Sequence, residues 1–173
     1  LMGSLMGEAT QQRTAAEFSE ALERIGATIS VSPGMYETTV TLNTLAKHLD
    51  EAMPLFMERI LEPAFTEEDF NRLKQQTLEG LQQQRKQPEA LAARAIGAVL
   101  EGASNPLSYP SSGIPATVEA ITLEDVKSFY AAHVPTHLSG VTVSTSLPQE
   151  DIVRAVQPLA AADLPLVGGL LHR

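Results

Sequence analysis

The sequence predicts an α+β domain in which several helices cover a small mixed or antiparallel sheet. Two observations carry this prediction. Residues 13–42 change from helical to alternating apolar spacing within one short stretch, which predicts a helix followed directly by a β-hairpin. The other apolar patterns give six or seven helices in all and one further strand, so strand–helix–strand units do not repeat.

The helix that precedes the hairpin has both a start signal and a stop signal. Thr14 followed by Glu17 is a capping box, and Gly26 is a typical C-terminal stop. The apolar residues between them recur at i, i+3, i+4 and i+7: Phe18, Ala21, Leu22 and Ile25. This spacing predicts a helix with one buried stripe.

The hairpin is predicted from alternation on both sides of a turn. Ile29 and Val31 fall on one face and polar residues on the other, and Val40 and Leu42 continue the return strand. Between the strands, residues 32–35 read Ser-Pro-Gly-Met, which favours a type II turn.

Helical patterns flank the hairpin. Residues 1–7 are typical of the last turns of a buried apolar helix. Residues 45–60 are apolar at helical spacing, but Pro54 interrupts them, so we expect a kink or a break into two shorter helices. Thr66 caps a long helix that begins with three carboxylates. Its predicted buried stripe is Phe70, Leu73, Thr77 and Leu81.

The second half of the chain alternates helices with breaks. We expect a helix over residues 88–102, a loop over residues 103–115 and a further helix from Thr122 to just before Pro135. Residues 138–145 alternate as a third strand.

A last helix is predicted to open at Pro148. We assign residues 1–157 to a single α+β domain and leave residues 158–173 as an unplaced tail or linker. Because the chain opens on Leu1 inside an apolar stretch, we expect it to be a fragment of a longer chain.

Composition excludes several classes of function. The formal charge is −9 and the basic residues are scattered among carboxylates, which argues against a nucleic-acid partner. The sequence has no cysteine, so disulfides, thiolate zinc sites and cysteine nucleophiles are excluded. No apolar run approaches the roughly 20 residues that a membrane-spanning helix needs, so we expect no membrane partner.

Five short segments carry a family resemblance by their order. They are Ala-Thr-Gln-Gln-Arg-Thr at 9–14, Leu-Ala-Lys-His-Leu-Asp-Glu-Ala at 45–52, Pro-Ala-Phe-Thr at 63–66, Asn-Pro-Leu-Ser-Tyr at 105–109 with Gly113, and Ile-Thr-Leu-Glu-Asp-Val at 121–126. Over residues 1–147 this order resembles the pitrilysin/insulinase family of zinc metallopeptidases. The resemblance implies a metallopeptidase domain of the LuxS/MPP-like class.

Catalytic members of that family carry an inverted zinc motif, His-x-x-Glu-His, just before the position of Ala9-Thr10. By that alignment Gly3 replaces the motif Glu, Ser4 replaces the second His, and the first His would precede Leu1. Glu79 stands at about the distance of the third ligand, as an orphan. Zinc needs at least three protein ligands, so we expect no metal and no catalytic residue in this segment.

Other candidate sites are weaker. His133 and His137 have the spacing of a helical metal pair, but a proline lies between them and no Glu accompanies them. Ser4 does not lie in a Gly-x-Ser-x-Gly elbow, so we reject a serine hydrolase.

The resemblance implies the non-catalytic half of a zinc peptidase, which shapes a peptide-binding chamber and pairs with a zinc-bearing homologous half. That half, in the same chain or in a partner subunit, would hold the zinc, and the substrate would be a peptide. Two alternatives stay open. One is a non-proteolytic scaffold subunit of the same fold, and the other is an active peptidase with a noncanonical site.

Two finer expectations concern substrate and compartment. The predicted hairpin offers polar outward positions, at Thr28, Ser30, Thr39 and Thr41, and an edge to which an extended peptide could add, although a strand of another segment could pair there instead. Bacterial members of the family with paired halves are often exported, so the resemblance implies a periplasmic location.

Overall fold

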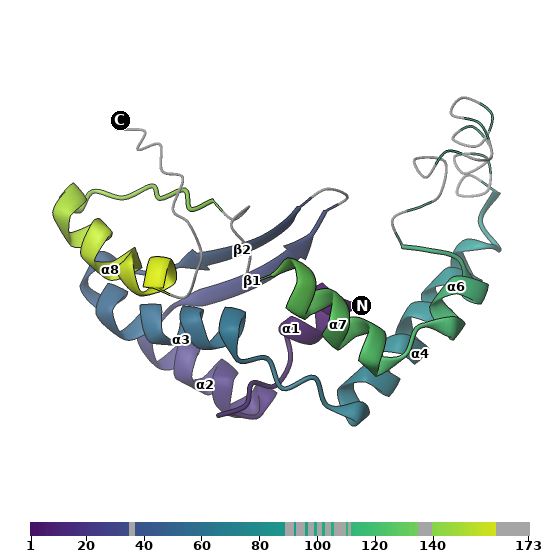
Figure 1. Ribbon diagram of the computed structural model, residues 1–173, viewed down its shortest axis with the longest axis horizontal. Coiled ribbons are helices and arrows are strands. Elements are labelled where there is room, and N and C mark those ends of the chain that lie inside the picture. Colours follow the sequence, from purple (N-terminus) through teal and green to yellow (C-terminus); the bar gives the residue numbers. More distant parts are fainter. Residues whose placement is uncertain are drawn as a thin grey trace.

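The computed structural model describes residues 1–34, 37–88, 112–134 and 140–161, together with single positions between 92 and 110. Its elements are α1 (Met2–Met6), α2 (Ala15–Ile25), β1 (Thr28–Pro33), β2 (Thr38–Asn43), the 3-10 turn η1 (Ala46–His48), α3 (Leu49–Leu61), α4 (Glu67–Gln84), α6 (Pro115–Ala120), α7 (Leu123–His133) and α8 (Gln149–Ala161). Helices cover a two-stranded antiparallel hairpin, and α4 with α6 extends away from it (Figure 1). The α+β class is confirmed.

The unit of α2 and the hairpin forms as its sequence predicts. The Thr14 hydroxyl accepts the Glu17 backbone N–H, while the Glu17 carboxylate accepts the Thr14 N–H. Gly26 ends the helix in the left-handed conformation, at φ 61°, which glycine adopts without strain. Ile29 pairs with Leu42 on the half-buried face of the sheet.

The turn of the hairpin lies later than predicted. Ser32 and Pro33 still belong to β1, where they pair with Thr39 and Thr38. The ladder therefore continues to the pair of Pro33 with Thr38, and beyond it the Gly34 N–H donates to the Glu37 carbonyl. A proline is tolerated at the end of an edge strand, so the Ser-Pro-Gly-Met signal does not stop the ladder at Ser32.

The predicted third strand is wrong, and the structure excludes one of the two outcomes expected at Pro54. Residues 140–145 form no strand, and the sheet of the described residues has two strands, because alternation yields a strand only where a neighbour supplies the ladder. Of the two outcomes expected at Pro54, the break does not occur, because α3 is one continuous helix from Leu49 to Leu61. Pro54 is the sixth residue of that helix, so the single backbone bond that it removes lies near the helix start.

One helix was not predicted, and another is longer than predicted. α6 starts at Pro115, where the sequence predicts the end of a loop, and this proline lies in the first turn of the helix. α8 passes through the predicted boundary at residue 157, and Leu159 is buried against Met53. Most of the predicted helix 88–102, most of the loop 103–115 and the residues after Ala161 lie outside the described part.

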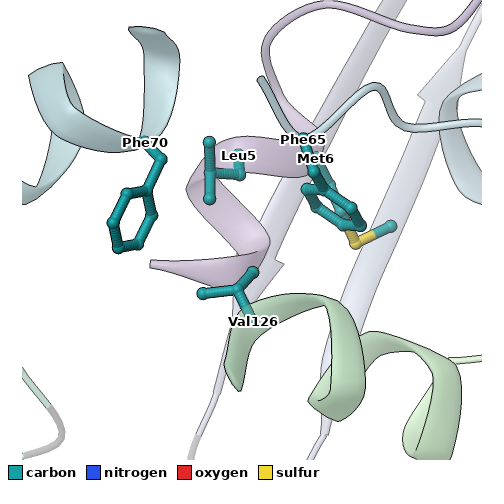
Figure 2. Close-up of a cluster of buried hydrophobic side chains, with 5 residues drawn as sticks. All are labelled: Leu5, Met6, Phe65, Phe70 and Val126. Atoms are coloured by element: carbon teal, nitrogen blue, oxygen red, sulfur yellow. The ribbon is translucent and has the colours of Figure 1, made fainter. Parts of the chain in front are cut away.

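The described residues form three hydrophobic core clusters. The first joins α1, α4, α7 and the loop before α4, with Leu5 at its centre (Figure 2). Its buried members are Leu5, Met6, Phe65, Phe70 and Val126. The second lies between α2, α3 and the hairpin, and the third joins α3 to α8. Through these clusters, α1 and the hairpin pack against the surrounding helices.

Polar contacts tie the outer helices to this core. The Tyr130 hydroxyl of α7 donates to the Ile60 carbonyl of α3 at 2.6 Å. The Lys74 ammonium of α4 donates to the carbonyls of Glu119 and Ile121, at 2.8 and 2.7 Å, and so holds the end of α6. Both contacts satisfy carbonyls that a helix end leaves without a backbone partner.

Candidate functional site

Helix α1 holds the positions where the zinc motif was expected. Gly3 is buried and carries no side chain, while the Ser4 hydroxyl is exposed. The next residues, Leu5 and Met6, face the core and are 1 % exposed. The helix therefore offers a single weak oxygen donor where a zinc site needs imidazole nitrogens or carboxylates.

The hairpin closes over the same helix. Pro33, at the end of β1, lies so close to Gly3 that a Cβ atom built there would be 3.0 Å from its Cγ, 3.1 Å from its Cβ and 3.2 Å from its Cδ. Real Cβ contacts are seldom this short, so the proline ring occupies the space that a side chain at position 3 would enter.

Glu79, at the predicted position of the third ligand, has a hydrogen-bond partner on its own helix. Glu79 lies exposed on α4, where its carboxylate accepts a hydrogen bond from the Gln75 amide at 3.0 Å. Across the described part of the chain, no three His, Asp or Glu side chains are grouped so that they could hold a metal ion. The residues present at Gly3, Ser4 and Glu79 thus do not fit zinc.

The predicted peptide-binding residues share one exposed surface. Thr28, Ser30, Thr39 and Thr41 are all exposed. Ser30 faces Thr41 across the ladder, Ser32 faces Thr39 and Thr28 faces Asn43, so all of them lie on the face of the hairpin opposite the core. We call these six residues the hydroxyl face. It carries no charge in a chain whose formal charge is −9.

A groove that the sequence did not suggest lies between α2 and α3. Its volume is about 720 Å³. Five carboxylates and two guanidinium groups line it, from Glu17, Glu20, Glu51, Glu58 and Glu62 and from Arg13 and Arg24. The groove is predominantly acidic, and its charges come from α2, from α3 and from the residues that flank them, which are distant in sequence.

At the end of the groove, Glu58 forms a buried polar cluster. It is 6 % exposed, accepts a hydrogen bond from the Thr10 hydroxyl at 2.5 Å and is ion-paired with Arg13. Its partners belong to the linker between α1 and α2. This cluster holds the linker against α3 and leaves no free carboxylate oxygen for a ligand.

Arg59 secures the other side of the same linker. Its guanidinium donates to the carbonyls of Met6, at 2.9 Å, and Glu8, and lies 3.7 Å from the ring centre of Phe18. Burial lowers the pKa of Arg59, while the nearby carboxylates of Glu58 and Glu8 counteract that effect. No local sequence pattern marks Glu58 and Arg59 as buried, so sequence reasoning did not single them out.

The histidines form no site in the described residues. His48 is bonded to Glu51 at 2.9 Å, and the His133 ring lies 4.4 Å from that of Phe129. His137 and His172 lie outside the described residues. None of the helices that the structure describes is both long enough and apolar enough to cross a membrane.

The chain matches a known protein family over most of its length. The model of the insulinase family, described as Peptidase family M16, matches residues 1–111. A curated relative from Helicobacter pylori, described as the non-peptidase homolog YmxG, is 27 % identical over 131 residues, which cover 76 % of this chain and 30 % of that protein.

Solved structures share the fold. The peptidase M16 inactive domain from Pseudomonas fluorescens matches with a TM-score of 0.78 and 22 % identity, over 99 % of this chain and 42 % of that one. A protease from Helicobacter pylori matches with a TM-score of 0.76 and 15 % identity, over 99 % and 41 %.

The first half of the periplasmic protease PqqL from Escherichia coli matches with a TM-score of 0.69 and 14 % identity, over 99 % of this chain and 38 % of that one. The chain therefore spans less than half the length of each of these relatives.

Proposed function

Because the chain belongs to the insulinase family, Peptidase family M16, we propose that it is a non-catalytic domain of a zinc peptidase. In this proposal it shapes a peptide-binding chamber and pairs with a homologous half that bears the zinc. The observation that carries it is the donor set of α1, where Gly3 and Ser4 stand at the positions that the family resemblance assigns to the motif Glu and His. A metal-activated water needs both the ligands and the base that these positions lack.

The similar structures support pairing. One is described as an inactive domain and another as the first half of a protease, and this chain covers about two fifths of each. A homologous half in the same chain or in a partner subunit would supply zinc and the catalytic base. The description of PqqL as periplasmic favours the same compartment for this protein.

The hydroxyl face is the surface we propose for the substrate peptide. Its residues are exposed, uncharged and regularly spaced, so they suit a peptide of varied sequence held in an extended conformation. Holding such a peptide in register would lower the barrier to cleavage even though the surface performs no chemistry.

A second candidate function is a non-proteolytic scaffold of the same fold. The description of YmxG as a non-peptidase homolog favours it, since the similarity to that protein covers about three quarters of this chain. The two candidates differ in whether a zinc-bearing half accompanies the chain. Metal-dependent peptide cleavage by the complete protein or complex supports the first, and its absence supports the scaffold.

The test of the missing site is elemental analysis of the purified chain after dialysis against metal-free buffer, together with a peptide-cleavage assay. We expect much less than one zinc per chain and no cleavage, because Ser4 and Glu79 are too few ligands. One zinc per chain that is lost in Glu79→Ala, or cleavage abolished by a substitution within this chain, would overturn the proposal.

The test of the hydroxyl face uses the complete peptidase with its zinc-bearing half. Thr39→Glu with Thr41→Glu places two charges on the face, and we expect kcat/KM for a neutral extended peptide to fall about tenfold or more with the melting temperature little changed. Gln76→Glu with Gln83→Glu, on exposed positions of α4, adds the same charge elsewhere as a control. Equal kinetics for both pairs would exclude the hydroxyl face as the substrate surface.

A further inference from the structure

We propose that Pro33 closes the metal position of α1, so that this chain has lost its zinc site through packing as well as through its ligands. Only the identification of position 3 with the motif Glu rests on the proposed function. The packing itself is a property of the fold. On this view, restoring ligand residues to α1 cannot restore a site while the hairpin keeps its place.

Position 3 favours glycine because there is too little room for a side chain, and not because of its backbone conformation. Gly3 lies within a helix and has no left-handed φ, so its backbone is open to any residue. Glycine is less favourable than alanine inside a helix, so a glycine there needs another reason. That reason is the three ring atoms of Pro33 at 3.0–3.2 Å from the Cβ position.

The closing residue is stiff. A proline ring has no rotamers by which it could swing away, unlike the far end of a flexible side chain. α1 is also held, because its other face buries Leu5 and Met6 in the first core cluster and Arg59 binds the Met6 carbonyl. A side chain at position 3 would therefore have to displace either the hairpin end or the core.

The chain offers an internal control for this argument. Gly80 also lies within a helix, α4, but it is exposed and has no atom within 4 Å of its Cβ position. Alanine at position 80 gains helix propensity at no steric cost, whereas alanine at position 3 gains the same propensity and meets Pro33.

The experiment measures thermal unfolding of Gly3→Ala, Gly80→Ala, Pro33→Gly and the double variant Gly3→Ala with Pro33→Gly. We expect Gly80→Ala to raise the midpoint by roughly 2–4 °C, as propensity predicts for a domain of this size. Gly3→Ala should lower it. In the Pro33→Gly background, which lacks all three ring atoms, Gly3→Ala should raise the midpoint as Gly80→Ala does.

A second arm uses Gly3→Glu, the motif residue itself, in both backgrounds. We expect it to unfold cooperatively only with Pro33→Gly. Because Gly3→Glu could fail to fold for other reasons, the alanine variants decide. A rise for Gly3→Ala in the native background overturns the inference, and so does an equal fall in both backgrounds, which would assign the exclusion to atoms other than Pro33.

Failure of this inference and failure of the proposed function are distinguishable. Stoichiometric zinc in the unmodified chain would overturn the proposed function and leave the unfolding comparison intact. If the effect of Gly3→Ala on the unfolding midpoint did not depend on Pro33, the inference that Pro33 closes the metal position would be overturned. The argument that α1 lacks zinc ligands would be unchanged.

Discussion

Two adjacent charged residues, Glu58 and Arg59, are each 6 % exposed and serve the same linker in different ways. Glu58 binds side chains of the linker, whereas Arg59 binds the backbone carbonyls of Met6, at the end of α1, and of Glu8, in the linker. Buried charges persist where every polar atom has a partner. Within the described residues, no buried side-chain nitrogen or oxygen lacks one.

Replacing Glu58 by glutamine tests the carboxylate of this cluster. Glutamine keeps the shape and one acceptor for Thr10 but places an amide opposite Arg13. The Arg13 side chain is 35 % exposed, so water screens part of the loss. We expect the free energy of unfolding in urea to fall by about 1–3 kcal/mol.

Glu51→Gln is the matched control, since its carboxylate is 61 % exposed and pairs only with His48 among the contacts of the described residues. We expect a change within about 0.5 kcal/mol for that variant. Equal effects at both positions would show that the Glu58 cluster adds nothing beyond a surface pair.

The buried cluster also shows why sequence reasoning missed part of the site. A capping box can be predicted because its residues are three apart, and Thr14 with Glu17 formed as expected. Glu58 and Arg13 are 45 positions apart, so their meeting depends on how α2 packs against α3. Nothing in the local pattern around Glu58 distinguishes it from an exposed carboxylate.

At the scale of elements, three helices begin with a threonine that accepts the backbone N–H of an acidic residue in the first turn. They are α2, α4 and α7, capped by Thr14, Thr66 and Thr122. The hydrogen bonds from Thr122 hold the pKa of Asp125 below its usual value, and the bond from Arg72 does the same for Asp69.

These carboxylates give the stability a defined dependence on pH. Because their pKa values are lower in the folded state, the unfolded chain binds more protons, and stability is lost as the pH falls. For Asp125 the loss begins near the ordinary value of 3.8 and continues as the pH falls through its lower folded value.

We expect Asp125→Asn to flatten this dependence in urea unfolding measured between about pH 6 and pH 2, because the variant has no proton to bind at that site. Asp50→Asn, an exposed carboxylate in the first turn of α3, is the control. If the free energy of unfolding of Asp125→Asn changed with pH as steeply as that of the unmodified chain, the contribution assigned to Asp125 would be contradicted.

The strands were harder to predict than the helices. α2, α4 and α7 carry their own start signals, whereas a strand depends on a neighbour. Residues 28–33 and 38–43 pair with each other and formed, but residues 140–145 alternate equally well and form no strand. Two residues of the predicted turn, Ser32 and Pro33, belong to β1 instead, because Pro33 fits a strand end as well as a turn.

At the scale of the whole molecule, the first core cluster joins parts that are far apart in sequence. Leu5 of α1 contacts the cluster that contains Phe70 of α4 and Val126 of α7 (Figure 2). No local pattern predicts this convergence. The same cluster keeps α1 in place beneath Pro33.

Leu5→Ala tests how much the cluster contributes. Leu5 is 1 % exposed, so we expect the free energy of unfolding to fall by about 2–5 kcal/mol. Leu45→Ala, at a site 57 % exposed, should change it by no more than about 0.5 kcal/mol. Hydrogen exchange should accelerate in α7 for the first variant alone, and unchanged protection there would contradict the role given to Leu5.

The partners of α1 also determine when this chain can fold during its synthesis. Leu5 leaves the ribosome long before Val126, and at about 5–20 residues per second the interval is roughly 6 to 24 seconds. Throughout that time the apolar side chains of α1 lack part of their cluster, while the contacts of α2 with the hairpin lie close in sequence and form early. The nascent chain therefore exposes the apolar side chains of α1 during this interval, the period in which a chaperone would bind them.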